Sequence, residues 1–322
     1  MIGITPPLMQ SPESFQATTV PGSKVCPMAE AIREHVPPGS TVFFGGMQHG
    51  EASAAIHEIV RQRIGGLTVV SALTHTVALL LGEGLIRKLV SAYLIDLYEK
   101  ENCLAARARR QGAYPQLEEL SHYGLSLALL AGQMGVPFLP TRSQLGSDYL
   151  RHNPNLRETA CPFTGQKLVA VRALNPDVGI LHVQRCDPTG AAHRWGTLGM
   201  DLMGINACKK IIITTERIVS PDVIRRDANR TVVPGFRVAA VVEAPWGAYP
   251  LHLAGCYNSD LPAFSAVCRD EDAYQAYVDR YIHDVADRTQ MMARLVADHG
   301  PAFLEKLKIR QPVEADPVLS GY

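Results

Sequence analysis

The 322-residue chain is predicted to fold as an α/β protein with an open, largely parallel sheet flanked by helices. Residues 177–183 and 210–215 are short apolar runs, each bounded by polar or turn residues, and the second is rich in β-branched side chains. Runs of this length are typical of strands buried on both faces of a sheet. Such strands alternate with helical patterns along the chain, and this order favours parallel strands joined by crossover helices.

The elements follow one another with clear breaks between them. A helix that starts near Met28 stops at Pro37, Pro38 and Gly39, because proline cannot continue a helix. Strands 88–94 and 136–140 are separated by a predicted helical hairpin, whose second helix is 120–134. The expected strands are 41–44, 67–72, 88–94, 136–140, 177–183, 210–215, 231–236 and 238–243, and the other expected helices are 28–36, 52–63 and 272–295.

One domain is expected over residues 25–311, with an irregular arm at each end. Residues 1–24 contain four prolines among Ser, Thr and Gln, and this composition is typical of a flexible segment. The tail 312–322 is again rich in Pro and Asp. No internal repeat and no shift in composition divides the part between them.

Composition excludes several classes of partner. Lys plus Arg and Asp plus Glu both total 31, so the net charge is zero. The sequence therefore predicts no basic surface for binding nucleic acid or an anionic membrane. The longest apolar run is far too short to span a bilayer, and no secretory signal is expected. The seven cysteines have no regular spacing, which indicates reduced thiols in a cytoplasmic protein. Neither the cysteines nor the histidines have the spacing of a metal site.

The first candidate for ligand binding is the glycine-rich turn after strand 41–44. Gly45, Gly46, Met47 and Gln48 precede a helix, so free backbone N–H groups and the positive end of the helix dipole could receive an acyl oxygen or phosphate. The alternative is a strand-to-helix turn that only needs the conformational freedom of glycine. The turn matches neither dinucleotide-binding nor Walker loops.

The second candidate is an acidic pair beside a serine and a histidine. Glu118 and Glu119 precede Ser121 and His122 at the start of an apolar helix, and such a group could supply a general base with hydrogen-bonding partners. The alternative is structural, because acidic residues in a first helical turn complement the helix dipole.

The third candidate is the loop 141–148, which leaves strand 136–140 at its carboxyl end, where open α/β sheets place ligands. Arg142 could bind a carboxylate, while Ser143, Gly146 and Ser147 could hold an acyl group. The alternative is a polar surface loop. Two rigid turns, 161–165 and 244–250, combine proline, an aromatic residue and glycine, and could form the walls of a pocket.

Three motifs in the second half of the chain, NPDV, DPTG and TTERIV, occur at residues 175–178, 187–190 and 214–219. With these motifs the chain resembles the A subunits of family I coenzyme A transferases of the glutaconate type, over residues 25–260. The resemblance assigns Gly45 and Gly46 to the acyl site, with Met47 where an aromatic residue is common. It also implies that loop 141–148 borders the substrate.

The same resemblance implies a partner and a chemistry. Family members combine A and B halves of the same fold, and a heterotetramer is expected. The B half carries a glutamate, in a Ser-Glu-Asn-Gly motif, that becomes a glutamyl-CoA thioester. The substrates would be a CoA thioester and carboxylic acids, with no tightly bound cofactor.

This chain does not carry the B-type glutamate motif. Glu101 and Asn102 are flanked by Lys100 and Cys103 rather than by serine and glycine, so the nucleophile is expected from the B chain. The segment 93–110 departs most from the relatives. Two alternatives therefore stay open. One is a CoA-thioester hydrolase or decarboxylase with Glu119 as base, as the resemblance to ring-cleaving relatives implies. The other is a non-catalytic scaffold half.

Overall fold

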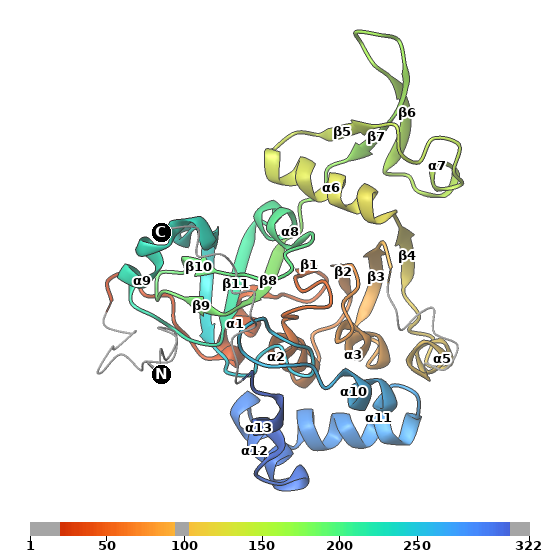
Figure 1. Ribbon diagram of the computed structural model, residues 1–322. Coiled ribbons are helices and arrows are strands. Elements are labelled where there is room, and N and C mark those ends of the chain that lie inside the picture. Colours follow the sequence, from red (N-terminus) through yellow and green to blue (C-terminus); the bar gives the residue numbers. More distant parts are fainter. Residues whose placement is uncertain (1–19, 94–102, 310–322) are drawn as a thin grey trace.

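The computed structural model describes residues 20–93 and 103–309, and its centre is a seven-stranded parallel sheet (Figure 1). The sheet confirms the predicted fold class. Neighbouring strands pair in parallel throughout, for example Ile212 with Ile180 and Val42 with Val69. In spatial order the strands are β13 (Val238–Glu243), β11 (Lys210–Thr215), β8 (Val178–Val183), β1 (Thr41–Phe44), β2 (Leu67–Ser71), β3 (Ile86–Ser91) and β4 (Gln116–Glu119).

Helices cover both faces of the sheet because its strands are apolar on both sides. Val42 and Phe44 point into one core and Phe43 into the other, as the alternation of a strand requires. The first core is covered by α1 (Met28–His35), α2 (Ser53–Arg61), α3 (Val77–Gly82) and α5 (Cys103–Arg110), and the second by α6 (His122–Met134) and α8 (Asp201–Ala207).

Two small antiparallel sheets complete the fold. One consists of β12 (Thr231–Val233), β10 (Ala192–His193) and β9 (Arg185–Cys186). The other consists of β5 (Phe138–Thr141), β7 (Lys167–Arg172) and β6 (Leu156–Ala160), and it projects from the body beyond α6 in Figure 1. The remaining elements are α7 (Tyr149–His152), α9 (Pro221–Arg226), η3 (Ala228–Arg230), η4 (Gly235–Arg237), α10 (Leu261–Val267), α11 (Glu271–Val278), η5 (Asp279–His283), α12 (Arg288–His299) and α13 (Phe303–Leu307).

Some element predictions were wrong in detail. The predicted strand 136–140 lies in the projecting antiparallel sheet and not in the parallel one, because α6 carries the chain away from the main sheet. The predicted helix 272–295 is divided into α11, the π-helix η5 and α12, and the Asp287 side chain accepts from the Gln290 amide where α12 begins. Residues 1–19 of the predicted arm, the last residue of predicted strand 88–94 and the tail 312–322 lie outside the described residues.

The strand order creates a topological switch point between β1 and β8. From β1 the chain continues to β2, β3 and β4 on one side, whereas β8 leads to β11 and β13 on the other. Both strands end at the same edge, since they are parallel, and open α/β folds bind ligands in the crevice outside the carboxyl ends at such a point. This edge therefore positions the candidate site.

Candidate functional site

The switch-point turn, residues 45–50, follows β1 and needs glycine at its second position. Gly46 has a φ of +108°, and a Cβ there would lie 2.4 Å from the Cα of Glu51. A side chain cannot fit against this backbone, so the close packing excludes every residue except glycine.

Most amides of the turn are already hydrogen-bonded. The amide of Gly45 donates to the Ile180 carbonyl at 3.0 Å, and that of Gly46 donates to Oδ1 of Asp201 at 2.8 Å. The Gln48 amide donates to the Leu73 carbonyl. Among the four predicted binding residues of this turn, only Met47 has an amide that makes no hydrogen bond to a described residue. The expectation that the glycine amides are free is therefore corrected, and Met47 N–H is the remaining donor.

A buried ion pair surrounds the turn. Asp201 and Arg194 are each 2 % exposed, and their Oδ2 and guanidinium nitrogen lie 2.6 Å apart. The pKa of Asp201 lies above its ordinary value because the carboxyl is buried, although the positive charge of the nearby Arg194 offsets part of this shift. Arg194 also donates to the carbonyls of His49, at 2.7 Å, and Gly50, at 3.1 Å. The two side chains thus hold both an amide and two carbonyls of the switch-point turn.

His49 is held as a neutral ring and is unsuited to acid–base chemistry. Its Nε2 accepts from the Ala254 amide at 3.0 Å, so the proton belongs on Nδ1, which lies 3.1 Å from the Thr197 carbonyl. Burial and the neighbouring Arg194 lower the pKa of His49 to about 3. The imidazole therefore fixes the turn against two distant loops.

Glu51 is a fully buried carboxylate that the sequence analysis did not identify. It accepts from the amides of His75 and Thr76, at 2.8 and 2.9 Å, and from the Thr76 hydroxyl at 2.7 Å. The donors lie directly before α3, where free amides and the helix dipole favour a negative charge. No motif marks Glu51, because its partners come from another loop.

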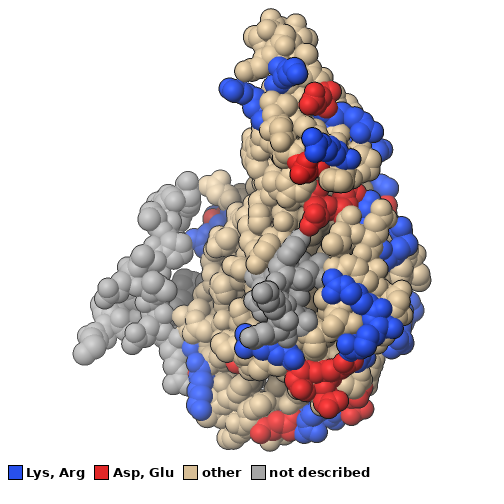
Figure 2. Space-filling model, turned by 90° about the vertical axis from the view of Figure 1, so that its right-hand side faces the viewer, with Lys and Arg blue, Asp and Glu red and all other residues tan. Residues whose placement is uncertain are grey.

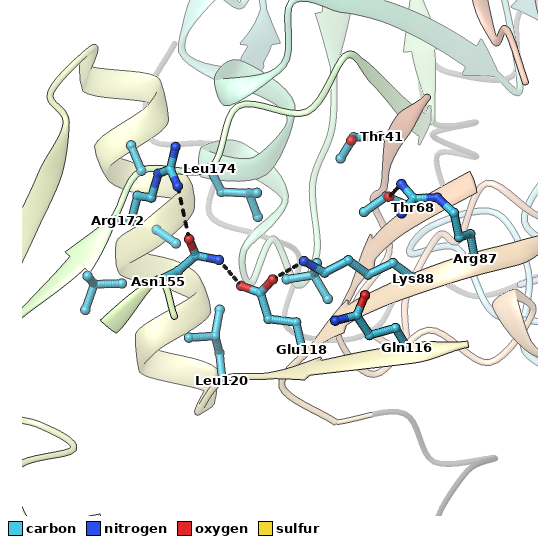
Figure 3. A pocket seen from close by; sticks show the side chains of 14 residues that line it. Thr41, Thr68, Arg87, Lys88, Gln116, Glu118, Leu120, Asn155, Arg172 and Leu174 are labelled. Carbon is cyan, nitrogen blue, oxygen red and sulfur yellow. Dashed lines mark hydrogen bonds and ion pairs between the residues drawn. The ribbon is translucent and has the colours of Figure 1, made fainter. Parts of the chain in front are cut away.

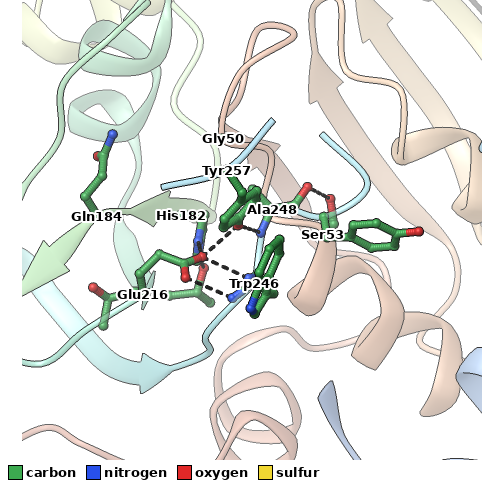
Figure 4. Close-up of polar contacts among 12 residues, drawn as sticks. Gly50, Ser53, His182, Gln184, Glu216, Trp246, Ala248 and Tyr257 are labelled. Atoms are coloured by element: carbon green, nitrogen blue, oxygen red, sulfur yellow. Dashed lines mark hydrogen bonds and ion pairs between the residues drawn. The ribbon is translucent and has the colours of Figure 1, made fainter. Parts of the chain in front are cut away.

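A second carboxylate, Glu216, joins the loop 244–250 to the sheet (Figure 4). Its oxygens accept from His182 Nε2 at 2.8 Å, from the Tyr257 hydroxyl at 2.7 Å and from the amides of Trp246 and Gly247. Burial alone would raise the pKa of Glu216, but the hydrogen bonds from His182 and Tyr257 outweigh it, and the pKa lies below its usual value. Glu216 is therefore an ionised structural anchor.

The acidic pair lies on edge strand β4 and not in a helix. Helix α6 begins at His122, and its N-cap is Ser121, whose hydroxyl accepts from the Gly124 amide. The structural alternative of carboxylates in the first helical turn was therefore wrong. Successive side chains of a strand point to opposite sides, and accordingly Glu118 is buried while the adjacent Glu119 is exposed.

The two glutamates have different contacts. Glu118 is buried, and it lies 2.5 Å from Lys88 Nζ and accepts from Asn155 at 2.6 Å (Figure 3). These contacts suit an ion pair that joins β4 to β3 and to the projecting sheet. Glu119 is exposed, and it lines a cavity of about 380 Å³ together with Ser147 and Asp148. His122 is exposed, with its ring centroid 6.5 Å from that of Tyr93 beyond the end of β3.

Loop 141–148 lies beside the acidic segment, although it leaves an antiparallel strand. The carboxyl-end rule for parallel sheets therefore does not apply to it. Gln144, with a φ of +74°, donates from Nε2 to the Ser121 hydroxyl at 2.8 Å and joins the loop to the start of α6. The structure brings Ser147 close to both glutamates, while Arg142 and Gly146 are exposed and Ser143 is half-buried, with its amide on the Thr141 hydroxyl.

The predicted site residues thus form two groups. The switch-point turn lies at the end of β1, while Glu118, Glu119, His122 and Ser147 gather around β4 and the start of α6. Met47 of the switch-point turn and Leu125 of α6 border the same small cavity, which therefore lies between the two groups. Of the two rigid turns, 244–250 surrounds Glu216, but 161–165 is the tip of the projecting hairpin, where Phe163 is 91 % exposed.

On the face seen in Figure 2, acidic and basic side chains are interspersed around the projecting sheet and the body below it. Across residues 20–93 and 103–309, no group of three or more His, Cys, Asp and Glu side chains is arranged to hold a metal ion. None of the described helices combines the length and the apolar character needed to cross a membrane.

Comparison with known proteins identifies the family. The sequence profile described as coenzyme A transferase matches residues 26–244, which is more than half of the chain. The chain belongs to the coenzyme A transferase family. A curated relative, the A subunit of the 3-oxoadipate CoA-transferase from Pseudomonas knackmussii, is 33 % identical over 285 residues, which cover 83 % of this chain and 96 % of the relative.

Two solved structures show the same arrangement. Glutaconate coenzyme A-transferase from Acidaminococcus fermentans is 28 % identical and superposes with a TM-score of 0.80, covering 89 % of this chain and 96 % of its own. The decarboxylase AibA/AibB is 26 % identical with a TM-score of 0.66, and the match covers 85 % and 99 % of the two chains. The predicted resemblance to the A halves of these enzymes is confirmed across most of the chain.

Proposed function

We propose that this chain is the A half of a heteromeric, cytoplasmic CoA-transferase that moves CoA between two carboxylic acids. The B chain supplies the glutamate that becomes the glutamyl-CoA thioester, and the two chains form a heterotetramer. The substrates are a CoA thioester and a free carboxylic acid, with no tightly bound cofactor. The switch-point turn of this chain receives the acyl oxygen.

The observation that carries this proposal is that the buried carboxylates near the switch point are all engaged. Glu51 is fully buried under its donors, Asp201 is paired with Arg194, and Glu216 holds the loop 244–250. None of the three can approach a thioester carbonyl, because each would leave buried donors without a partner. Glu101 lies outside the described residues, and its neighbours Lys100 and Cys103 do not match the B-type motif. A nucleophile from a second chain fits this arrangement.

A trapping experiment tests the proposal. We expect the chain, co-expressed with its B subunit and incubated with acyl-CoA, to yield a borohydride-reducible glutamyl thioester on the B chain only. The covalent adduct is located by mass spectrometry of both chains, with this chain by itself as control. An adduct on this chain, or a B partner without the Ser-Glu-Asn-Gly glutamate, would contradict the assignment.

A second candidate function is CoA-thioester hydrolysis or decarboxylation with Glu119 as base. Two observations favour it: the match to a decarboxylase, and the exposed position of Glu119 on a cavity wall.

For this candidate, Glu119→Gln is expected to lower turnover at least about 100-fold, since a general base contributes about that much. The melting temperature should stay the same because the side chain is exposed. Glu158→Gln, which changes an exposed carboxylate on β6, is the matched control. Steady-state kinetics on both variants decide the matter, and equal rates for the two would eliminate Glu119 as the base.

A further inference from the structure

The switch-point turn is held by two side chains that come from the other half of the sheet. Asp201 is the first residue of α8, and Arg194 directly follows β10, while the turn follows β1. Both side chains therefore cross the switch point from the segment that lies between β8 and β11. The turn cannot move relative to that segment without breaking their contacts.

The two side chains leave the turn few conformational choices. Asp201 fixes the Gly46 amide through Oδ1, and its Oδ2 pairs with Arg194. Arg194 reaches the carbonyls of His49 and Gly50, and also that of His182 in β8. The two side chains thus hold the backbone on both sides of Met47, at Gly46 before it and at His49 and Gly50 after it, while the Met47 amide itself makes no hydrogen bond to a described residue.

Stability alone does not account for this arrangement. A fully buried ion pair is costly to desolvate, and replacing such a pair by apolar side chains is often neutral or stabilising. What a buried pair can provide is a single defined conformation, and a site that binds a developing negative charge needs donors that are already in place.

We propose that Asp201 and Arg194 are positioning residues for acyl transfer: they hold the switch-point turn so that Met47 N–H is preorganised to donate to the acyl oxygen. This inference rests on the proposed function, because it assigns supporting residues to the same acyl site. Neither residue touches the substrate, and both act through the backbone of the turn.

The test compares Asp201→Asn and Asp201→Ala with Glu58→Gln in the complex with the B chain. Asp201→Asn keeps an oxygen that can accept from Gly46, whereas Asp201→Ala removes it. Glu58 is an equally buried carboxylate, paired with Arg61 on α2 and remote from the turn, so Glu58→Gln is the matched control.

We expect Asp201→Ala to lower kcat on the order of 100-fold, with a much smaller effect for Asp201→Asn and an unchanged KM for acyl-CoA. Glu58→Gln should lower the melting temperature without lowering kcat. Folded Asp201 variants with the kcat of the control would overturn the inference. If Asp201→Ala does not fold, Asp201→Asn still decides, because loss of the charge alone should lower kcat while leaving KM unchanged.

A second measurement does not depend on activity. In the isolated chain, hydrogen exchange at the Gly46 amide should accelerate in Asp201→Ala and stay at the wild-type rate in Glu58→Gln. Unchanged exchange in the Asp201 variant would contradict a positioning role. A wild-type complex without transferase activity would contradict the proposed function. The hydrogen-exchange rate at Gly46 would still show whether Asp201 holds the switch-point turn.

Discussion

Replacing Gly46 by alanine is expected to abolish acyl transfer and to lower the free energy of unfolding by about 4 kcal/mol. Two penalties add up in this estimate. A φ of +108° is strained for any residue with a side chain, and the new Cβ would lie 2.4 Å from the Cα and 2.7 Å from the amide nitrogen of Glu51. The clash is with backbone, so no side-chain rearrangement can relieve it.

The turn must therefore open, and Gly46 would lose its hydrogen bond to Asp201. Gly165→Ala is the matched control, since Gly165 also has a positive φ of +70° but no atom within 4 Å of the position of a Cβ. It should cost only about 1 kcal/mol and leave turnover intact. Urea unfolding and steady-state kinetics check both variants, and similar stabilities would mean that the turn adapts to a side chain at Gly46.

The main sheet could be predicted from the sequence because its strands are apolar on both faces. The runs that contain Val178–Val183 and Lys210–Thr215 have few alternatives to a central parallel strand. Strand β4 was missed for the opposite reason: Gln116–Glu119 is an edge strand with three exposed residues, and its sequence resembles the first turn of a helix. Likewise, the apolar segment before Thr141 gives no indication of which sheet it joins.

The candidate site was predicted in its outline but not in its supporting contacts. The two glycines after β1 identify the turn, because a positive φ and a close approach leave a direct mark in the sequence. The residues that hold the turn, Arg194 and Asp201, lie about 150 residues further along the chain in an ordinary polar context, as the separations of their contacts show. Their role depends on tertiary contacts, which leave no local pattern in the sequence.

Mild acid is expected to destabilise the protein well above the pH at which its carboxylates titrate. His57 and His182 are buried beside Arg288 and Glu216, respectively, and burial lowers the pKa of both rings. A buried histidine stays neutral in the folded chain, whereas in the unfolded chain it binds a proton below about pH 6.5. The unfolded state therefore takes up more protons as the pH falls, and folding loses up to about 1.4 kcal/mol per pH unit for each such ring.

The groups that face these rings do not cancel this effect. Arg288 and Arg61 lie near His57 and oppose its protonation, whereas Glu216 favours protonation of His182 without reversing the effect of burial. Burial raises the pKa of Asp201, so this carboxyl takes up its proton in the folded chain above its ordinary range and opposes the acid effect there. The lowered pKa of Glu216 adds to the loss of stability only below its own ordinary range. Between about pH 6.5 and 5 the loss of stability therefore comes from the histidines.

Urea unfolding at several pH values between about 7 and 5 measures this slope. His57→Gln removes one buried ring and should reduce the slope by up to about 1.4 kcal/mol per pH unit, whereas the same change at exposed His122 should leave it unaltered. A stability that is flat down to about pH 5 would mean that these rings gain protons in the folded state, and that the contact between His182 and Glu216 is a charged pair. Because the two substitutions have the same chemistry, a difference between their slopes reports the surroundings of the buried ring, which are its burial and the nearby Arg288 and Arg61.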